Sequence, residues 1–495
     1  MNFVPFYISP EIILTVGGIL VLLAGLGVRK WDVPGKIKPY SPEVLTLAVL
    51  VAALVPSIML LTRIGSHGVS QFGGMIAVDH LSIFFKIIAL ISAIIVVFLA
   101  MDYFRGVRIH RGEFYALLIF AVLAINFLAA ATDLIMIYLS LEFLSITSYI
   151  LVGFLKQDRK SNEAAIKYFL YGAVAAAVMV YGMSMFYGLT ATTSLAGIHH
   201  FLGLTAPSDL PHIVFLGLLF MLVGFGFKVA MVPFHQWAPD TYEGAPTPIT
   251  AFLSVGSKAA GFAVLIRVLG SCVTADTLNW VPMMAILSGL TMTVGNLTAI
   301  PQVNIKRMLA YSSIGQAGYL LLGVAAMRYS ALALPSVLLY LFIYLFMNLG
   351  AFAVVTIVSA RLNSDDIRDY GGLMKRAPMA AVAMVFFLLS LAGIPPAAGF
   401  IAKFYLFSAA IQSNNSTIIW LAVVAIANTV ASVYYYMNVA RHMFFVKPKS
   451  EEPLRISWAM NFVVGITLAV TLLVFLYAQP FIELAHRSAA MLTGT

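Results

Sequence analysis

Charged side chains are scarce in this sequence. They make up 10% of 495 residues, whereas 61% of the residues are apolar and the mean hydropathy is +0.97. A soluble chain carries roughly 25% charged residues. Most of this chain must therefore face lipid or other helices. Because backbone groups in lipid must be hydrogen-bonded within their own segment, the composition excludes a soluble protein and predicts a polytopic all-α membrane protein.

Residues that hold cofactors are equally scarce. A single cysteine, Cys272, excludes an intramolecular disulfide and a thiolate-bound iron–sulfur cluster. The nine histidines show no metal-ligand spacing, and no dinucleotide fingerprint or phosphate loop is present. The net charge of +9 does not indicate nucleic acid, because basic loops on one side of a membrane give the same excess. We expect no cofactor or metal in this chain and no nucleic-acid partner.

Apolar windows between charged or Pro/Gly-containing breaks predict about fourteen membrane-spanning helices. Their ranges are 11–28, 43–62, 80–100, 114–131, 133–155, 164–189, 212–238, 247–270, 280–299, 305–327, 333–360, 377–412, 417–446 and 457–482.

Basic residues gather in the loops on one side of these spans. Loops after odd-numbered spans hold twenty of them: Arg29, Lys30, Lys36, Lys38, Arg105, Arg108, Arg111, Lys156, Arg159, Lys160, Lys306, Arg307, Arg361, Arg368, Lys375, Arg376, Arg441, Lys447, Lys449 and Arg455. The other side holds three, Arg63, Arg328 and Arg487. The bias predicts cytoplasmic odd-to-even loops and both termini outside.

Six basic residues remain inside the predicted spans: Lys86, Lys167, Lys228, Lys258, Arg267 and Lys403. Lys86 and Arg267 lie near span ends, where long side chains snorkel to the interface, and Lys167 has that option too. Glu142 is the acidic residue placed mid-span.

Placing an ionisable group near the bilayer centre costs roughly 2.5–3.5 kcal/mol. We therefore expect these residues to have a structural or functional role. A static ion pair with Glu142 explains one lysine. A proton relay explains several, because burial and a nearby carboxylate move a lysine pKa in opposite directions.

Polar neighbours favour the relay. Tyr138, Glu142, Ser145 and Tyr149 form a stripe at helical spacing, which cannot face lipid. His235 lies seven residues after Lys228. We expect it to share a helix face with that lysine, as a relay group or a satisfied core histidine.

Two spans are interrupted by proline, at Pro233 with Pro239 and at Pro395 with Pro396. Spans 4–8 and 9–13 then form two five-helix repeats with a break in the fourth helix of each, and an odd helix number makes the second repeat inverted. The predicted division is 1–110, 111–271, 272–450 and 451–495. Paired broken helices in inverted repeats indicate an ion path. We interpret Lys228 and Lys403 as proton carriers in two half-paths, Lys258 as their link and Glu142 as a modulator.

Four motifs in order, Ser161–Phe169, Pro233–Pro248, Lys306–Gln316 and Gly393–Phe400, resemble the antiporter-like membrane subunits of respiratory complex I. The resemblance covers almost the whole chain. Lys403 after the second break, and the lack of a long lateral helix after span 14, favour a smaller paralogue of this family over the largest.

The resemblance implies that the family's relay residues are Glu142, Lys167, Lys228, Lys258 and Lys403, with Lys167 as a second partner of Glu142. It also implies a bacterial inner-membrane location beside other membrane-arm subunits. FMN, iron–sulfur clusters, NADH and quinone would be bound by other subunits.

Three alternatives stay open: a subunit of a multi-subunit cation/proton antiporter, a passive membrane scaffold, and an independent solute transporter.

Overall fold

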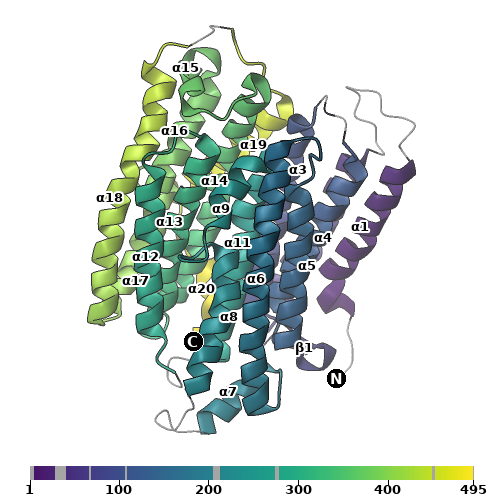
Figure 1. The fold of residues 1–495 in the computed structure, drawn as a ribbon, viewed down its shortest axis with the longest axis vertical. Coiled ribbons are helices and arrows are strands. Elements are labelled where there is room, and N and C mark those ends of the chain that lie inside the picture. Colours follow the sequence, from purple (N-terminus) through teal and green to yellow (C-terminus); the bar gives the residue numbers. More distant parts are fainter. Residues whose placement is uncertain are drawn as a thin grey trace.

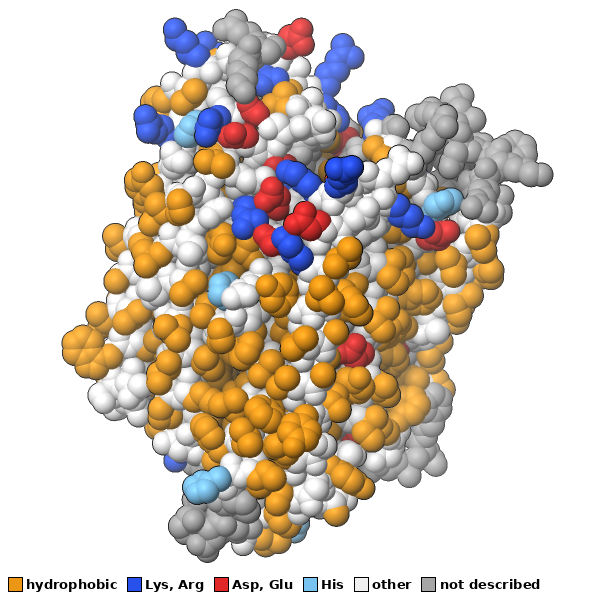
Figure 2. Space-filling view, viewed as in Figure 1, with side chains coloured by type: hydrophobic (Ala, Val, Ile, Leu, Met, Phe, Trp, Pro, Cys, Tyr) orange, Lys and Arg blue, Asp and Glu red, His pale blue; other side chains and the backbone are white. Residues whose placement is uncertain are grey.

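The computed structural model describes residues 5–27, 41–65, 68–105, 107, 109–204, 212–273, 278–448 and 452–493. Arg29, Lys30, Lys36, Lys38, Arg108 and Lys449 of the basic loops lie outside the described residues. The chain is a bundle of long helices that run roughly side by side (Figure 1). Hydrophobic side chains cover the middle of the face in Figure 2, and charged side chains gather toward its upper end.

Within the described ranges, thirteen helical segments are long and apolar enough to span a membrane. They are η1 with α1 (Pro5–Ile8, Ser9–Gly27), α2 (Pro42–Arg63), α3 (His80–Tyr103), α4 (Arg111–Ala130), α5 (Leu134–Val152), α6 (Arg159–Thr190), α8 (His212–Val229), α10 with η5 and α11 (Thr247–Phe252, Leu253–Ser257, Lys258–Ser271), α12 (Val281–Ala299), α13 (Ile305–Ala326), α14 (Ala333–Leu362), α18 (Ser416–Phe445) and α19 (Trp458–Leu476). The shorter apolar helices α16 (Pro378–Ala392) and α17 (Ala398–Gln412) together form the predicted twelfth span. The polytopic helical fold is confirmed.

The remaining elements are short. They are α7 (Leu195–Leu204), α9 (Trp237–Gly244), α15 (Leu373–Arg376), α20 (Gln479–Thr493), η3 (Phe72–Gly74), η6 (Ile367–Tyr370) and an antiparallel pair, β1 (Val69–Gln71) with β2 (Ile76–Val78), in the register Val69↔Val78.

The chain after α19 differs from the prediction. The last span was expected to continue to residue 482, but it ends at Leu476, and α20 packs back against α14 and α3. Phe481 of α20 contacts Phe342 of α14 with ring centroids 5.3 Å apart. The Gln479-Pro480 start interrupts the helix, since proline is tolerated in a first turn but not in a helix interior.

Both predicted broken helices are interrupted in the same way. After α8, Ala230 takes a left-handed conformation (φ 60°), and after α16 Gly393 does the same (φ 79°). The next amide then bonds the carbonyl five residues back, at 2.8 Å for Met231 and 3.0 Å for Ile394. A cis proline follows in each, at Pro233 and at Pro396.

Pro239 is not part of the first break. It lies in the first turn of α9, where its missing N–H leaves no hydrogen bond unmade.

A second feature also occurs twice. An isolated antiparallel bridge joins Asp133, the N-cap of α5, to Ser194, and another joins Asn304, the N-cap of α13, to Asp366. In each, the bridging residue follows the next long helix along the chain. The helices beside the two bridges, α7 and α15, lie at opposite ends of the bundle (Figure 1).

Lys86 and Arg267 do not snorkel, and that interpretation was wrong. Lys86 is 1% exposed and lies 2.8 Å from Glu11 of α1. Arg267 is 3% exposed and donates two hydrogen bonds to Asp79, at 2.9 and 3.1 Å. Both cations are buried by neighbouring helices that bring a carboxylate to them, which sequence position alone does not show.

Arg267→Gln should destabilise the chain by about 3–5 kcal/mol, because it leaves the Asp79 carboxylate buried without its partner. Burial raises the pKa of the Cys272 thiol to about 12, so this sole cysteine reacts with a thiol-reactive dye only on unfolding. Dye-monitored unfolding of the purified chain measures the difference. Arg368→Gln removes an exposed ion pair and should change stability by less than about 0.5 kcal/mol. Equal stabilities for the two variants would contradict the role assigned to the buried pair.

Candidate functional site: buried lysines at two broken helices

Lys228 lies at the end of α8, directly before the first break, and is fully buried. Its Nζ donates a 3.0 Å hydrogen bond to Ser145 Oγ on α5 and lies 6.0 Å from the ring centre of Tyr168 on α6. Glu142, one turn before Ser145, interacts with it electrostatically. The Ser145 contact thus places Lys228 one helical turn from Glu142 along α5.

The polar stripe of α5 lies at the edge of a buried surface. Ser145 is buried, while Glu142 and Tyr149 are partly buried, and Glu142 Oε1 is enclosed without a hydrogen-bond partner. Leu139 and Ile146, on the face of α5 next to the stripe, are exposed. The stripe therefore faces protein at its boundary with the lipid-facing side.

Helix α9 closes the end of α8. Its Trp237 Nε1 donates a 2.8 Å hydrogen bond to the carbonyl of Phe227, the residue before Lys228, and Trp237 stacks on Tyr168 with ring centroids 4.4 Å apart. The Phe227 carbonyl also accepts a 3.1 Å hydrogen bond from the Ala230 amide, so the indole is its second donor.

His235 does not share a helix face with Lys228. Helix α8 ends at Val229, and Ala230 turns the chain out of the helical path, so the seven-residue spacing carries no face relation. His235 is partly buried in the connecting turn, and its Nδ1 is enclosed without a hydrogen-bond partner.

Lys258 begins α11, directly after the π-helical turn η5, and is 3% exposed. Its Nζ donates to the carbonyl oxygen of Ser313 at 2.7 Å and to Ser313 Oγ at 2.6 Å. Tyr344 of α14 also donates to Ser313 Oγ, at 2.9 Å. This lysine therefore binds the second predicted repeat, not the first.

Lys403 lies on α17 after the second break and is 3% exposed. Its Nζ donates to the carbonyl oxygen of Ala392, at the end of α16, at 3.1 Å, and to Thr429 Oγ1 at 3.3 Å. It also lies 4.5 Å from the ring centre of Tyr319. The free carbonyl end of α16 carries partial negative charge, which stabilises an ammonium there.

Uncharged polar side chains fill the space between α13, α14 and α18, and sequence reasoning did not select them. Gln316 Nε2 donates to the Leu391 carbonyl at 2.9 Å and to Tyr436 at 3.3 Å, while Tyr340 donates to Gln316 Oε1. Tyr436 also bonds Ser312. The run Ser312-Ser313 followed by Gln316 inside an apolar helix was the signal available.

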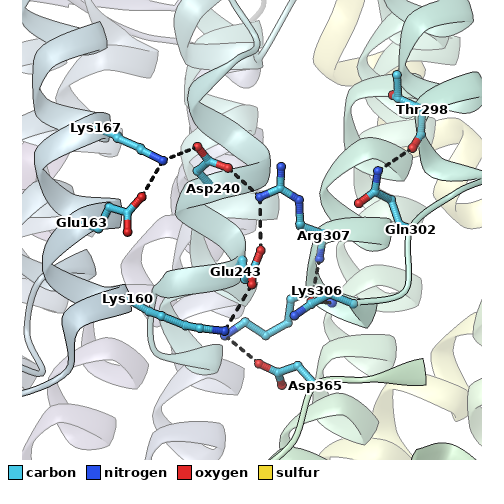
Figure 3. A network of polar contacts seen from close by, with 11 residues as sticks. Lys160, Glu163, Lys167, Asp240, Glu243, Thr298, Gln302, Lys306, Arg307 and Asp365 are labelled. Carbon is cyan, nitrogen blue, oxygen red and sulfur yellow. Dashed lines mark hydrogen bonds and ion pairs between the residues drawn. The ribbon is translucent and has the colours of Figure 1, made fainter. Parts of the chain in front are cut away.

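A cluster of ion pairs joins the two predicted repeats at the charged end of the bundle (Figures 2 and 3). It comprises Lys160, Glu163 and Lys167 of α6, Asp240 and Glu243 of α9, Lys306 and Arg307 of α13, and Asp365. This cluster also lines a pocket. Seven of the eight lining residues belong to α6 and α9, and the eighth is Arg307. Lys306, counted with the loops, is 4% exposed.

Lys167 belongs to this cluster and not to the surroundings of Glu142. Its Nζ lies 2.7 Å from Glu163 and 2.9 Å from Asp240. Burial alone would raise the pKa of the Asp240 carboxyl, but hydrogen bonds from Lys167 and Arg307 hold that pKa below its usual range. The carboxylate is thus ionised at neutral pH, and its attraction to both cations is lost only as the pH falls through that lowered value.

The fold and these sites are those of a membrane subunit with many helices and an antiporter-like architecture. Residues 131–429 match the family described as "NADH:quinone oxidoreductase/Mrp antiporter, TM". The chain belongs to the family of NADH-quinone oxidoreductase N subunits. It is 40% identical to subunit N of Heliobacterium modesticaldum over 99% of this chain and 100% of that protein.

Solved structures agree. A chain of respiratory complex I from Thermus thermophilus with bound aureothin is 32% identical, with a TM-score of 0.78 over 96% of this chain and 98% of that one. A chain of the Mrp complex from Dietzia sp. is 20% identical, with a TM-score of 0.85 over 99% and 97%, and shares the fold. The family resemblance is confirmed.

Gly393→Ala should reduce proton translocation without removing any charge. An added Cβ would lie 2.6 Å from Lys403 Cδ, so the lysine must move away from the Ala392 carbonyl. The left-handed backbone there adds about 1–2 kcal/mol of strain. Proton uptake in vesicles that contain the assembled complex measures the effect. Gly188→Ala, which meets no atom within 4 Å, is the matched control. Similar pumping by both variants would contradict the placement of Lys403.

Proposed function

We propose that this chain translocates protons as a membrane-arm subunit of an NADH:quinone oxidoreductase. One observation carries the proposal: among the six basic residues inside the predicted spans, the five buried ones are of two kinds. Lys86 and Arg267 contact carboxylates, at 2.8 and 2.9 Å. Lys228, Lys258 and Lys403 donate instead to neutral hydroxyl and carbonyl oxygens.

The two kinds of contact have different consequences for a proton. A carboxylate supplies a full opposite charge, which holds a buried ammonium permanently charged. Neutral oxygens accept a hydrogen bond and supply only partial charge, so burial keeps the cost of the charged form high. A lysine in such a site exchanges its proton when a nearby charge changes. A proton relay needs several lysines of this kind. If these three lysines formed structural ion pairs instead, they would contact carboxylates, as Lys86 and Arg267 do.

Each residue has a proposed role. Lys228 and Lys403 carry protons in two half-paths, Lys258 links them, and Glu142 modulates Lys228 through its charge. The contact of Lys258 with Ser313 supports the linking role, because it crosses from the first predicted repeat to the second. The enclosed Nδ1 of His235 is consistent with a further relay group in the turn after α8. Lys167 acts in the ionic cluster.

The inverted repeats at 111–271 and 272–450 are part of the proposal. The matched breaks and the matched bridges Asp133↔Ser194 and Asn304↔Asp366 support them. The relay is not symmetric, since Lys228 precedes its break and Lys403 follows its own. Segments 1–110 and 451–495 flank the repeats.

The chain is a multi-pass membrane protein, and we place it in the bacterial inner membrane with both termini outside. The start of α1 and helix α20 lie in the lower half of Figure 1, whereas charged side chains gather at the upper end in Figure 2. Its partners are the other membrane-arm subunits. We assign NADH, FMN, iron–sulfur clusters and quinone to other subunits of the complex, so redox energy reaches this chain as a change in conformation or charge.

Lys228→Ala in the assembled complex should lower the protons translocated per electron by roughly tenfold or more, since removal of a proton-transferring group has effects of this order. Lys258→Ala and Lys403→Ala should act alike. Proton uptake and NADH oxidation are measured together in vesicles. Arg368→Gln, which removes an exposed cation outside the relay, is the control. An unchanged ratio in all three lysine variants would support a passive scaffold instead.

The family also includes cation/proton antiporter subunits, so sodium is the second candidate ion. At each position the neutral oxygens bind the ammonium group of a lysine, which carries a proton. This arrangement favours protons as the transported ion. Proton translocation by the assembled complex should therefore persist in sodium-free vesicles. A strict requirement for sodium would favour the antiporter function, and solute transport by the isolated chain would favour an independent transporter.

A further inference from the structure

Helix α9 is the second half of the first broken helix, and it is attached at both ends. At its start, Trp237 bonds the Phe227 carbonyl beside Lys228 and stacks on Tyr168, the ring that faces Lys228. At its far end, Gly244 packs so closely on α6 that an added Cβ would lie 2.4 Å from the Lys160 carbonyl oxygen. The position of α9 therefore sets what surrounds Lys228.

Helix α13 holds α9 from the other side through two consecutive cations. Arg307 Nη1 lies 2.5 Å from Asp240 Oδ1 and 3.1 Å from Glu243 Oε2, which are one turn apart on α9. Lys306 Nζ donates a 3.0 Å hydrogen bond to the Ala245 carbonyl at the end of α9. We call these five residues the α9 clamp; Figure 3 labels all of them except Ala245.

The same helix carries the contacts of the other two lysines. Ser313, six residues after Arg307, accepts both hydrogen bonds of Lys258. Gln316 donates to the Leu391 carbonyl, which directly precedes the carbonyl that binds Lys403. Arg307 and Gln316 are about 14 Å apart along the axis at 1.5 Å per residue. One rigid helix thus touches the surroundings of all three relay lysines.

We propose that Arg307 is a positioning residue that, through the α9 clamp, keeps the site of Lys228 in register with the sites of Lys258 and Lys403. This inference rests on the proposed function. Arg307 contacts no relay lysine; it acts through α9 and Trp237 on one side and through α13 on the other.

The α9 clamp is held by contacts that can break and re-form. Its ion pairs are partly exposed, at about 24–30% for the side chains of Asp240, Glu243 and Arg307, so their attraction is moderate and salt-sensitive. Asp240 binds Lys167 through its other oxygen, and Lys167 also binds Glu163, so each of these groups has a second partner. An exchange of partners would move α9 without placing an unpaired charge in lipid. The buried pair of Arg267 and Asp79 has no such alternative.

The test uses the assembled complex in vesicles, with Arg307→Gln, Asp240→Asn and the double variant. Each should lower protons translocated per electron by roughly fivefold, the lower end of the range for coupling between sites, while NADH oxidation continues. The double variant should lose less than the two single losses combined, since both single variants break the same pair, Arg307 with Asp240. Arg307→Lys should restore part of the ratio, because a lysine reaches one carboxylate and lacks the guanidinium fork.

Hydrogen–deuterium exchange of the α9 segment is the second readout, and it should rise in Arg307→Gln and not in Arg368→Gln. Wild-type pumping in Arg307→Gln and Asp240→Asn would overturn the inference, as would additive losses in the double variant or no rescue by Arg307→Lys. If Lys228→Ala itself pumps normally, the proposed function fails. If Lys228→Ala is inactive and Arg307→Gln is normal, only the clamp fails.

Discussion

A positive charge inside a membrane protein must have a partner, and the choice of partner divides the molecule into what is fixed and what can change. Lys86 and Arg267 have carboxylates beside them and join helices permanently. Lys228, Lys258 and Lys403 have hydroxyls and carbonyls, and one of these, the Ala392 carbonyl, lies at a helix break. The broken helices, the polar residues between α13 and α18 and the close packing of α9 all follow from the need to satisfy those three ammonium groups without neutralising them.

Most of the fold could be predicted because lipid imposes strong rules. A spanning segment must be apolar and helical, and so the predicted span ends agree with the helices to within a few residues for most of the chain. The positions of proline predicted both helix breaks, because proline lacks the backbone N–H that a helix interior needs. The errors fall where those rules are weak. The end of α19 and the amphipathic α20 follow packing against α14, and Pro239 is harmless in the first turn of α9.

The sites were less predictable, since a partner distant in the sequence leaves no local mark. The depth of Lys228 and Lys258 in their spans was sufficient to select them, and Lys403 followed from its break. The sequence around Lys86 and Arg267 does not indicate that Glu11 and Asp79 are their partners. The family resemblance selected Lys167 but not its contacts, which go to Glu163 and Asp240. His235 was misplaced because helical periodicity was carried across a residue that leaves the helix.

The central claim is that the three lysines on neutral oxygens change protonation during turnover. Infrared difference spectra of the complex, recorded as NADH drives it and with this subunit's lysines labelled with ¹⁵N, measure this directly. The account predicts isotope-sensitive N–H bending bands that disappear in the variants lacking Lys228, Lys258 and Lys403. A difference spectrum with no lysine bands, recorded from a complex that pumps at the normal ratio, would contradict it.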